Sequence, residues 1–289
     1  MKAQITKRKR ILDKTATVAL WILAAGVILL IAWLLFHILS RGITKINLSF
    51  LLKVPDEIET GGGIGPVLLN SFYVLILSMV FSLPVGIGAG IYLAEYARDN
   101  KVTGAIRMCV ESLASVPSIV FGLFGMAIFV NYLQIGLTVI GASLTLALLN
   151  LPILTRVTEE SIRAVPNALR EAYTAMGATK SQCIRKVVLP TAFSRIITGI
   201  SLVAGRAYGE SAVIILTAGT STSGMMWDFN LFSPGETLAV HLWYVQSEAI
   251  VPDAKEIADK AAAVLVFVVL MINFLLRLPV WFMERKFKI

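Results

Sequence analysis

Long uncharged runs, separated by short charged segments, make up most of the chain. The first run extends from Ala16 to Leu39, and the second extends from Pro66 to Ala94. A helix that crosses about 30 Å of hydrocarbon needs roughly 20 apolar residues, and both runs are long enough. The pattern therefore predicts a transmembrane helix over residues 16–39 and a second one over residues 66–94.

The next uncharged run is about twice as long as a single span needs to be. It extends from Ser112 to Thr155 and is interrupted only by NYLQIG at residues 131–136, which predicts two helices joined by a tight turn. A fifth span is predicted over roughly residues 196–218, and a sixth over roughly residues 261–283. The expected fold is an all-α membrane protein with six transmembrane helices.

The composition excludes an ordinary soluble domain. Of the 289 residues, 57% are hydrophobic and 15% are charged, and the mean hydropathy is +0.79. A soluble chain of this length carries about 25% charged residues. The chain is therefore expected to be an integral membrane protein.

Basic and acidic residues occupy different connecting segments, which predicts the orientation of the chain. Acidic residues outnumber basic ones in PDEIETGGG, which begins at Pro55, and in residues 228–260. Because Lys and Arg in short segments stay cytoplasmic, both termini are predicted to be cytoplasmic, with tails of residues 1–15 and 284–289. The same asymmetry accounts for the net charge of +8 more economically than nucleic-acid binding does. The basic or mixed-basic segments are residues 1–10, 95–107, 156–195 and 284–289.

The cytoplasmic segment between the fourth and fifth spans predicts two short amphipathic helices. In PNALREAYTAMG, the apolar residues Leu169, Ala172, Tyr173 and Met176 follow the spacing of one helical face. Gly177 follows, at a position where a helix end favours a residue that tolerates positive φ. The apolar stripe then needs a partner, which could be another protein, the membrane surface or the chain's own helices.

The second short helix is predicted to begin after the glycine. TKSQ, from Thr179 to Gln182, matches a capping box, and the apolar residues that follow it share one side. Pro190 is expected to end this helix. The two helices would then form an elbow in the cytoplasm.

Arg206 and Glu210 are predicted to lie near the middle of the fifth span, in AGRAYGESA. Each would cost about 2.5 to 3.5 kcal/mol in contact with lipid, so both must face a cavity or each other. Four residues rise about 6 Å along one helix face, which is close enough for an ion pair. The pair is either a structural salt bridge or part of an anion path in which Arg206 supplies the positive charge. His37 and His241 are predicted to be ordinary interfacial residues.

The glycines of GIGAG, residues 86–90, are predicted to let helices approach closely rather than to bind a dinucleotide, because they lie inside an uncharged span. The chain also lacks G-x-x-x-x-G-K-[ST], so it cannot cradle the phosphates of ATP by itself. If transport is driven by ATP, the energy must enter through another protein.

The elbow resembles the EAA loop of permease subunits of bacterial ABC importers. Glu171, Ala172, Gly177, Leu189 and Pro190 stand at the spacing of that loop. Tyr173 replaces the second Ala and Val187 the usual Ile, and both substitutions keep the apolar face. The resemblance implies that residues 166–190 form a coupling helix region that docks on an ATPase subunit, with Tyr173 among its contacts.

Three further motifs narrow the resemblance to the PstA family, the permease subunits of phosphate-specific ABC importers. They are LPVGIGAGIYLAEYA from Leu83, VPSIVFGLFG from Val116 and GRAYGESA from Gly205. The resemblance extends over a domain of residues 63–283 and implies a type I (MetI-like) permease fold in a bacterial or archaeal inner membrane. It implies a non-catalytic subunit that carries inorganic phosphate along a path with Arg206, Glu210 and Arg156.

The same resemblance implies the partners. They are a second permease (PstC-like), an ATPase dimer (PstB-like) that binds ATP and magnesium, and an extracytoplasmic phosphate-binding protein (PstS-like); no cofactor is expected in this chain. Two alternatives stay open. The cargo could be another anion such as phosphonate, sulfate or molybdate, or the chain could be a secondary transporter, although no inverted repeat with broken helices is evident.

Overall fold

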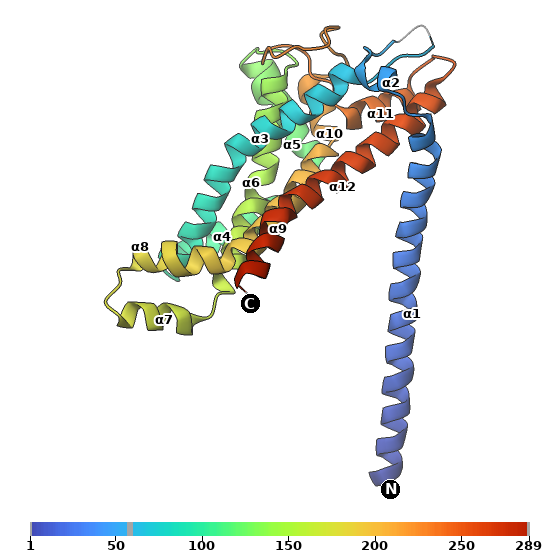
Figure 1. The fold of residues 1–289 in the computed structure, drawn as a ribbon. Helices are drawn as coiled ribbons and strands as arrows, with labels where there is room; N and C mark the ends of the chain where they lie inside the picture. Colours follow the sequence, from blue (N-terminus) through green and yellow to red (C-terminus); the bar gives the residue numbers. More distant parts are fainter. Residues whose placement is uncertain (1, 57–59, 288–289) are drawn as a thin grey trace.

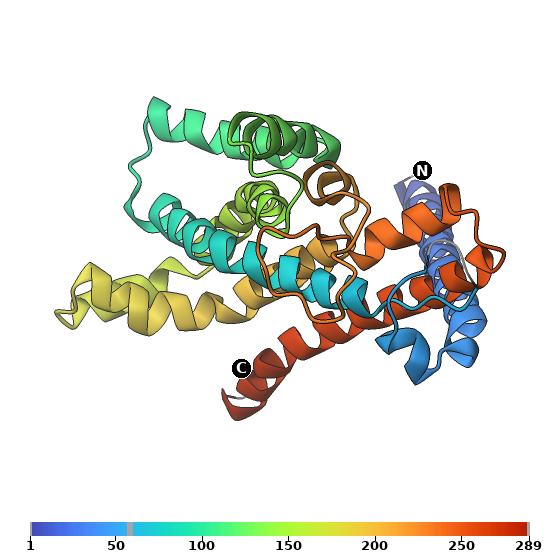
Figure 2. The ribbon, with the colours of Figure 1, turned by 90° about the horizontal axis from the view of Figure 1, so that it is seen from above.

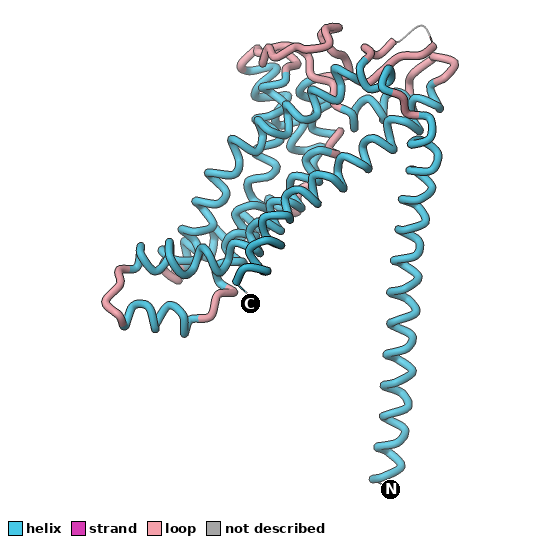
Figure 3. Tube along the Cα trace, viewed as in Figure 1, coloured by secondary structure: helices cyan, strands magenta, loops and turns pink. Residues whose placement is uncertain are grey.

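The computed structural model describes residues 2–56 and 60–287, and these residues are almost entirely helical (Figures 1 and 3). Within them the only β-pairing is an isolated bridge between Thr222 and Gly235. The α-helices are α1 (Lys2–Gly42), α2 (Leu48–Leu52), α3 (Gly65–Ile91), α4 (Lys101–Ala114), α5 (Ser118–Gly125), α6 (Val139–Arg163), α7 (Asn167–Ala175), α8 (Lys180–Cys183), α9 (Leu189–Tyr208), α10 (Ala212–Ala218), α11 (Leu238–Ser247) and α12 (Ala254–Phe287). One 3-10 turn, η1 (Ile43–Lys45), and three π-helical segments, η2 (Tyr92–Tyr96), η3 (Met126–Tyr132) and η4 (Ile184–Val188), extend them.

Five helical segments in the described residues are long and apolar enough to cross a membrane, and a bent pair of helices raises the number to six. The pair consists of Lys101–Ala114 and Ser118–Tyr132, which meet at 96°. Pro117 lies in the break between them, because a proline cannot donate the backbone hydrogen bond that would continue α4. The five straight segments are Leu12–Lys45, Gly65–Tyr96, Val139–Arg163, Lys180–Tyr208 and Ala254–Phe282.

Two of the predicted helix ends are wrong. The fifth span was expected to be continuous over residues 196–218, but α9 ends at Tyr208 and α10 begins only at Ala212. Pro190 was expected to end a short helix, but the helix continues through it from α8 into α9. The π-helical segment η4 precedes the proline, and its wider turn accommodates a residue that lacks an N–H group.

The predicted role of the GIGAG glycines is confirmed, because two of them allow α3 and α6 to pack closely. A Cβ atom on Gly86 would lie 2.7 Å from the Leu154 Cβ atom, and one on Gly90 would lie 2.5 Å from the Thr158 Cβ atom. Both distances are shorter than van der Waals contact. The two helices form the centre of the core, which buries Val74, Leu146 and Leu154 among others.

Helix α1 stands apart from the rest of the described chain. No part of its most apolar stretch is buried inside the protein. It meets the other helices at its end, where Gly42 lies against the Asp259 carbonyl and Ala263 of α12. Viewed from above, α1 lies at the edge of the molecule, beside the beginning of α12 (Figure 2).

The two ends of the chain and the elbow of α7 and α8 lie toward the same end of the molecule (Figure 1). The long loops on either side of α11 lie at the opposite end, which we call the outer end. Within the two predicted tails, the structure describes residues 2–15 and 284–287, and they belong to α1 and α12. Residues 1, 57–59, 288 and 289 lie outside the described residues, and so does part of the acidic segment that begins at Pro55.

Candidate functional site

The elbow has the local geometry that the sequence predicts. Gly177 joins α7 to α8 with φ of +84°, a left-handed conformation that favours glycine. The capping box is complete: the Thr179 N–H donates to Gln182 Oε1 at 2.9 Å, and the Gln182 N–H donates to Thr179 Oγ1 at 3.4 Å. Residues 177–182 therefore contain the local signals for the turn between the two helices.

The apolar stripe of the elbow is only partly covered by the chain itself. Tyr173 and Leu189 are half-buried and pack against an inner cluster that includes Ile162 and Val188. In contrast, Leu169 is 43% exposed and Met176 is 75% exposed. The remaining predicted docking residues, Glu171, Ala172, Gly177 and Pro190, are all exposed. The elbow therefore presents a mixed apolar and polar surface that no described residue covers.

A buried ion pair, which the sequence analysis missed, fixes α7 to the end of α3. The Arg170 Nε and Nη2 atoms donate to Glu95 Oε1 at 3.1 Å and 3.0 Å. The same guanidinium donates to the carbonyls of Val165 at 2.5 Å and Ile162 at 2.8 Å, and to Asn167 Oδ1 at 3.1 Å. The two side chains are 20% and 9% exposed, so water screens their attraction only weakly.

The Glu95 region also holds the second helix of the elbow. The Lys180 ammonium donates to the Glu95 carbonyl and lies over the Tyr96 ring, 5.1 Å from its centroid. Glu95 therefore bonds to α7 through its side chain and to α8 through its backbone. In the sequence, Glu95 is visible only as a charged residue directly after an uncharged run. Its partner Arg170 lies 75 residues away, so no local pattern indicates the ion pair.

A second set of ion pairs joins α4 to α6 on the same side of the protein. The Arg107 Nε atom donates to Glu159 Oε1 at 2.7 Å, and Arg163 Nε lies 3.1 Å from the same oxygen. Arg107 also pairs with Asp99 at 3.1 Å. Arg107 is one-quarter exposed and Glu159 is largely buried, so this pair helps to hold the bent α4–α5 segment against α6.

Arg156, one of the three predicted path residues, is already paired. Its Nη1 atom lies 3.0 Å from Glu111 Oε1 on α4, and its Nε atom lies 2.8 Å from Glu160 Oε1 one turn further along α6. The Arg156 side chain is 45% exposed, and both carboxylates are more exposed still. It could therefore still reach an anion at the surface of α6.

Arg206 and Glu210 do not share a helix face as predicted. Arg206 lies in the last turn of α9, whereas Glu210 lies in the break between α9 and α10. The structure places no ion pair between them, because the chain leaves the helical path after Tyr208. Gly209 follows at the C-cap, and its N–H donates to the Arg206 carbonyl at 3.2 Å.

Arg206 is exposed, and its guanidinium contacts no hydrogen-bonding or acidic partner among the described residues. The neighbouring Gly205 packs against Asn273 of α12, whose amide is already bonded to Ser201 and to the Val269 carbonyl. Ala204 lines an open apolar groove formed by α3, α9 and α12. An unpaired arginine in a membrane-crossing helix must be covered by a cavity or by another chain.

The packing of α6 on α9 gives the order of Arg156 and Arg206 across the membrane. Val157 meets Gly199, and the two helices run in opposite directions. Arg156 therefore lies at the level of Gly199, and Arg206 lies about 10 Å further toward the outer end. The structure places the two arginines at successive levels, although it does not bring them into contact.

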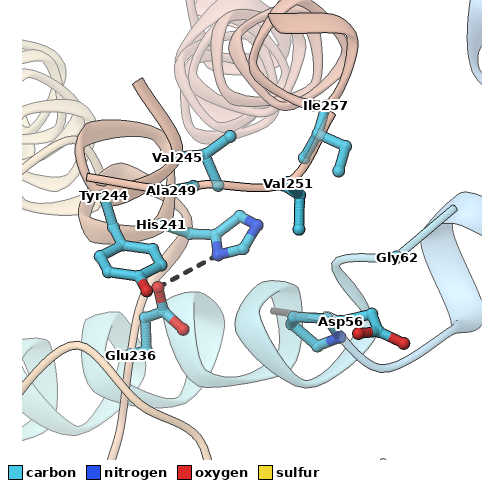
Figure 4. A pocket seen from close by; sticks show the side chains of 11 residues that line it. Asp56, Gly62, Glu236, His241, Tyr244, Val245, Ala249, Val251 and Ile257 are labelled. Atoms are coloured by element: carbon cyan, nitrogen blue, oxygen red, sulfur yellow. Dashed lines mark hydrogen bonds and ion pairs between the residues drawn. The ribbon is translucent and has the colours of Figure 1, made fainter. Parts of the chain in front are cut away.

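The prediction for His241 is wrong, because its side chain is buried at the outer end. Its Nδ1 atom lies 3.1 Å from Glu236 Oε1, and the two side chains are 6% and 5% exposed (Figure 4). The predicted interfacial character fits His37, which is exposed on α1 and stacks on Trp33 with ring centroids 5.5 Å apart. Single-sequence patterns did not reveal the Glu236 contact, because nothing indicated that the segment before α11 folds inward.

Comparison with known proteins identifies the group to which these features correspond. Residues 86–288 match the family model described as binding-protein-dependent transport system inner membrane component. The chain is 42% identical over 275 residues to a probable ABC transporter permease protein, YqgI, of Bacillus subtilis, covering 92% of this chain and 94% of that protein. It is 32% identical over 256 residues to the phosphate transport system permease protein PstA of Haemophilus influenzae, covering 89% and 88%.

The fold is also similar to that of solved ABC importer structures. A chain of a bacterial alginate ABC transporter, crystallised in complex with a periplasmic protein bound to an alginate pentasaccharide, superposes with a TM-score of 0.61. The match covers 92% of this chain and 95% of that one at 16% sequence identity. The predicted all-helical ABC importer permease fold of the MetI-like type is confirmed.

Proposed function

Because the chain belongs to the family of binding-protein-dependent transport system inner membrane components, we propose that it forms part of the phosphate path of an ATP-driven importer. It is a non-catalytic, multi-pass permease subunit of an ABC importer in the inner membrane. The proposal concerns the cargo and the residues that guide it. The single observation that carries it is Arg206, an exposed cation in a membrane-crossing helix, for which the described residues supply no hydrogen-bonding or acidic partner.

The chemistry of Arg206 fits an oxyanion. A guanidinium presents planar N–H donors that match two oxygens of phosphate, and it stays charged at every pH of interest. The chain leaves helical geometry at Gly209, only three residues after Arg206. Irregular backbone at membrane depth is tolerated where it lines a cavity, which is what a transport path requires.

Phosphate is favoured over other anions by the relatives. PstA of Haemophilus influenzae is named as a phosphate transport permease, and it aligns with most of this chain. Arginine alone would also suit sulfate, molybdate or phosphonate, so the choice among anions rests on that similarity. An ATP-independent transporter is disfavoured, since the relative YqgI is named as a probable ABC transporter permease.

The exposed surfaces of the chain support a second permease as a partner. Arg206 and the apolar groove formed by α3, α9 and α12 both need cover within the membrane, and α1 leaves its apolar stretch unburied. We propose a PstC-like subunit for this position. A PstS-like binding protein would deliver phosphate at the outer end, in the way that the alginate transporter was crystallised with a periplasmic protein.

The elbow is the proposed contact with a PstB-like ATPase dimer, which would bind ATP and magnesium. Leu169 and Met176 are exposed at the surface of α7, and Glu171 adds a charge beside them. Lipid could cover such a surface, but the elbow lies with both chain ends at the end opposite the long loops (Figure 1). This arrangement agrees with the proposed cytoplasmic position of both termini.

The deciding experiment is ATP hydrolysis by the complete complex in proteoliposomes. The complex would be supplied with its binding protein and with phosphate, sulfate or no anion. Stimulation of ATP hydrolysis by phosphate alone supports the proposal. Loss of that stimulation in Arg206→Ala would support a role for Arg206 in the phosphate path. Equal stimulation by sulfate would make the chain a general oxyanion permease and overturn the phosphate assignment.

A further inference from the structure

Two buried polar side chains in the core have no hydrogen-bond partner among the described residues. They are Ser82 of α3, which is 0% exposed, and Asn150 of α6, which is 1% exposed. The unpaired atoms are Ser82 Oγ and both Oδ1 and Nδ2 of Asn150. Each residue lies near the middle of its membrane-crossing segment, Gly65–Tyr96 or Val139–Arg163. Lipid offers no hydrogen bonds at this depth, so these atoms require a partner inside the protein.

Other buried hydroxyl groups of the same two helices are satisfied within their own helix. Four of them donate to a backbone carbonyl three or four residues earlier, at 2.7 to 2.9 Å. They belong to Ser71 and Ser78 of α3 and to Ser143 and Thr145 of α6. Ser82 makes no such bond, so its hydroxyl is free to bond across the helix interface.

The packing of α3 on α6 brings Ser82 and Asn150 to the same level. The two helices run in the same direction, and they meet at Gly86 and Leu154 and again one turn further on. One turn before the Gly86–Leu154 contact, the same register sets residue 82 opposite residue 150. Two unpaired polar side chains therefore share one level of the interface between the two helices.

Helix α9 borders the same level with apolar side chains. Asn150 lies two turns before Val157, which meets Gly199 of α9. Beyond Gly199, the side of α9 that is buried includes Val203 and Ala207, which are 1% and 3% exposed. Neither carries a hydrogen-bonding side chain. Helix α9 therefore leaves the Asn150 amide to Ser82 or to a small ligand.

Both polar residues begin the same short pattern. Residues 82–84 read Ser-Leu-Pro, and residues 150–152 read Asn-Leu-Pro. Pro84 and Pro152 lie inside their helices and lack the N–H group that would complete a backbone hydrogen bond there. A helix bends most easily at such a position. The two polar side chains therefore lie beside the point at which each helix is easiest to bend.

We propose that Ser82 and Asn150 bind an internal water that bridges α3 and α6. A direct bond from the Ser82 hydroxyl to one amide atom of Asn150 would leave the other amide atom unpaired. A water both donates and accepts, and internal waters typically make about three hydrogen bonds to otherwise unpaired groups. An ion fits less well, because α3 contains no charged residue and the Asn150 amide is neutral.

A bridging water would let the contact between α3 and α6 change without leaving polar atoms unpaired. If the helices bend at Pro84 and Pro152 during transport, a water can shift its bonds as the distance between the side chains changes. A direct bond between the side chains would have to break. This consequence, unlike the water site itself, rests on the proposed function.

Radiolytic labelling tests for the water directly. A short X-ray pulse converts bound water into hydroxyl radicals, which oxidise adjacent side chains even where bulk solvent does not reach them. The assembled complex in lipid nanodiscs would be irradiated, digested and analysed by mass spectrometry, with rates corrected for intrinsic reactivity. Leu154 lies one turn from Asn150 and is 1% exposed, as is Ile214 of α10. We expect Leu154 to be oxidised several-fold faster than Ile214, and equal rates would overturn the proposal.

Replacing the amide should remove this excess labelling. Asn150→Leu has a similar volume but no polar atom, so Leu154 should then be oxidised no faster than Ile214. Ser82→Ala is the smaller change, and it supplies the same test if Asn150→Leu does not assemble. Undiminished labelling of Leu154 in either variant would overturn the proposal.

Thermal unfolding of the assembled complex provides an independent test through the sign of its response. If Ser82 and Asn150 share a water, Asn150→Leu leaves the Ser82 hydroxyl without a partner, and the midpoint temperature should fall by a few degrees. If the site is dry, the same variant removes two unpaired polar atoms, and the midpoint should rise. Ser82→Ala should lower the midpoint by itself but not in the Asn150→Leu background. A higher midpoint in Asn150→Leu would overturn the proposal.

Ser78 supplies the matched control. It is a buried serine one turn before Ser82, but its hydroxyl is bonded to the Leu75 carbonyl at 2.9 Å. Ser78→Ala should leave the labelling of Leu154 unchanged, and its effect on the midpoint should add to that of Asn150→Leu. Coupling between Ser82 and Asn150 without labelling of Leu154 would indicate a direct bond and overturn the water site. Neither readout depends on whether phosphate is the cargo.

Discussion

Arg170 and Arg206 lie in the same stretch of chain, one at the elbow and the other near the end of α9, and they differ in almost every contact. Arg170 donates to a carboxylate, two backbone carbonyls and an amide oxygen, and it is mostly buried. Arg206 is exposed and its guanidinium has no such partner in the part of the chain that the structure describes.

The difference separates two uses of an arginine. A guanidinium whose donors are all occupied holds pieces of structure together, and removing it leaves a buried partner without a counter-charge. A guanidinium without partners inside a membrane is available to a second chain or to an anion. We therefore expect Arg170 to position the elbow and Arg206 to serve transport directly, and the variants below test that division.

The largest effect is expected for Arg206→Ala. If Arg206 supplies the positive charge of the path, phosphate uptake into proteoliposomes should fall at least about 30-fold while the complex stays intact, because losing one partner of a desolvated charge pair costs about 2 to 5 kcal/mol. Arg195→Ala, also exposed on α9, is the control and should retain uptake. Uptake at the wild-type rate in Arg206→Ala would assign Arg206 a role in contact with another chain only.

Arg170→Ala should weaken binding of the ATPase subunits about tenfold or more. The change leaves Glu95 buried without its counter-charge and frees α7 from the end of α3. Co-purification of the ATPase with the permease pair measures the effect. Arg185→Ala is the matched control, because it also removes one positive charge from this region. Arg185 is exposed in η4, so its replacement should leave ATPase binding unchanged. Equal loss in both variants would mean that the charge of this region, and not the Arg170 contacts, supports docking.

A smaller effect is expected when the turn itself is strained. Gly177→Val forces a β-branched residue into φ of +84°, which costs about 1 to 2 kcal/mol and should weaken ATPase binding several-fold. Gly136→Val imposes the same type of penalty at φ of +75° in the turn between η3 and α6, and neither glycine has an atom near its missing Cβ. Only the elbow variant should lose ATPase. Unchanged binding and transport in Gly177→Val would show that the docking surface does not depend on this turn.

Arg156→Ala should give the smallest change, a decrease in uptake of about two- to fivefold. Its pairs with Glu111 and Glu160 are exposed, and such pairs are worth about 0 to 1 kcal/mol. Initial rates of phosphate uptake measure the effect. A loss as large as that of Arg206→Ala would instead place Arg156 in direct contact with the anion.

Local signals in the sequence predicted the parts of the fold that depend on neighbouring residues. The uncharged runs gave the membrane-crossing segments, and residues 177–182 gave the glycine turn and the capping box. Helix propensity and capping depend on residues that are close together in the chain, so they can be predicted from a single sequence.

Features that depend on distant residues were not predictable in this way. Arg170 and Glu95 lie 75 residues apart, and the inward fold that buries His241 depends on packing against α3 and α12. The break after Tyr208 was also missed, because the apolar run resumes at Ala212 and the pattern does not show whether the chain stays helical across Gly209 and Glu210. Hydrophobic periodicity reports which residues are apolar, but it does not report which partner buries them.

The π-helical segment η4 gives the elbow its direction. A π-turn holds one residue more than an α-turn, so each residue before it is rotated about the helix axis relative to a regular helix. If the same five residues formed a regular α-helix, the segment would turn further about its axis, and α8 would rotate against α9 and carry α7 with it. The docking surface would then face away from its present direction while every side chain on it stayed the same, so the angle at which the two proteins meet depends on one extra residue in a helix.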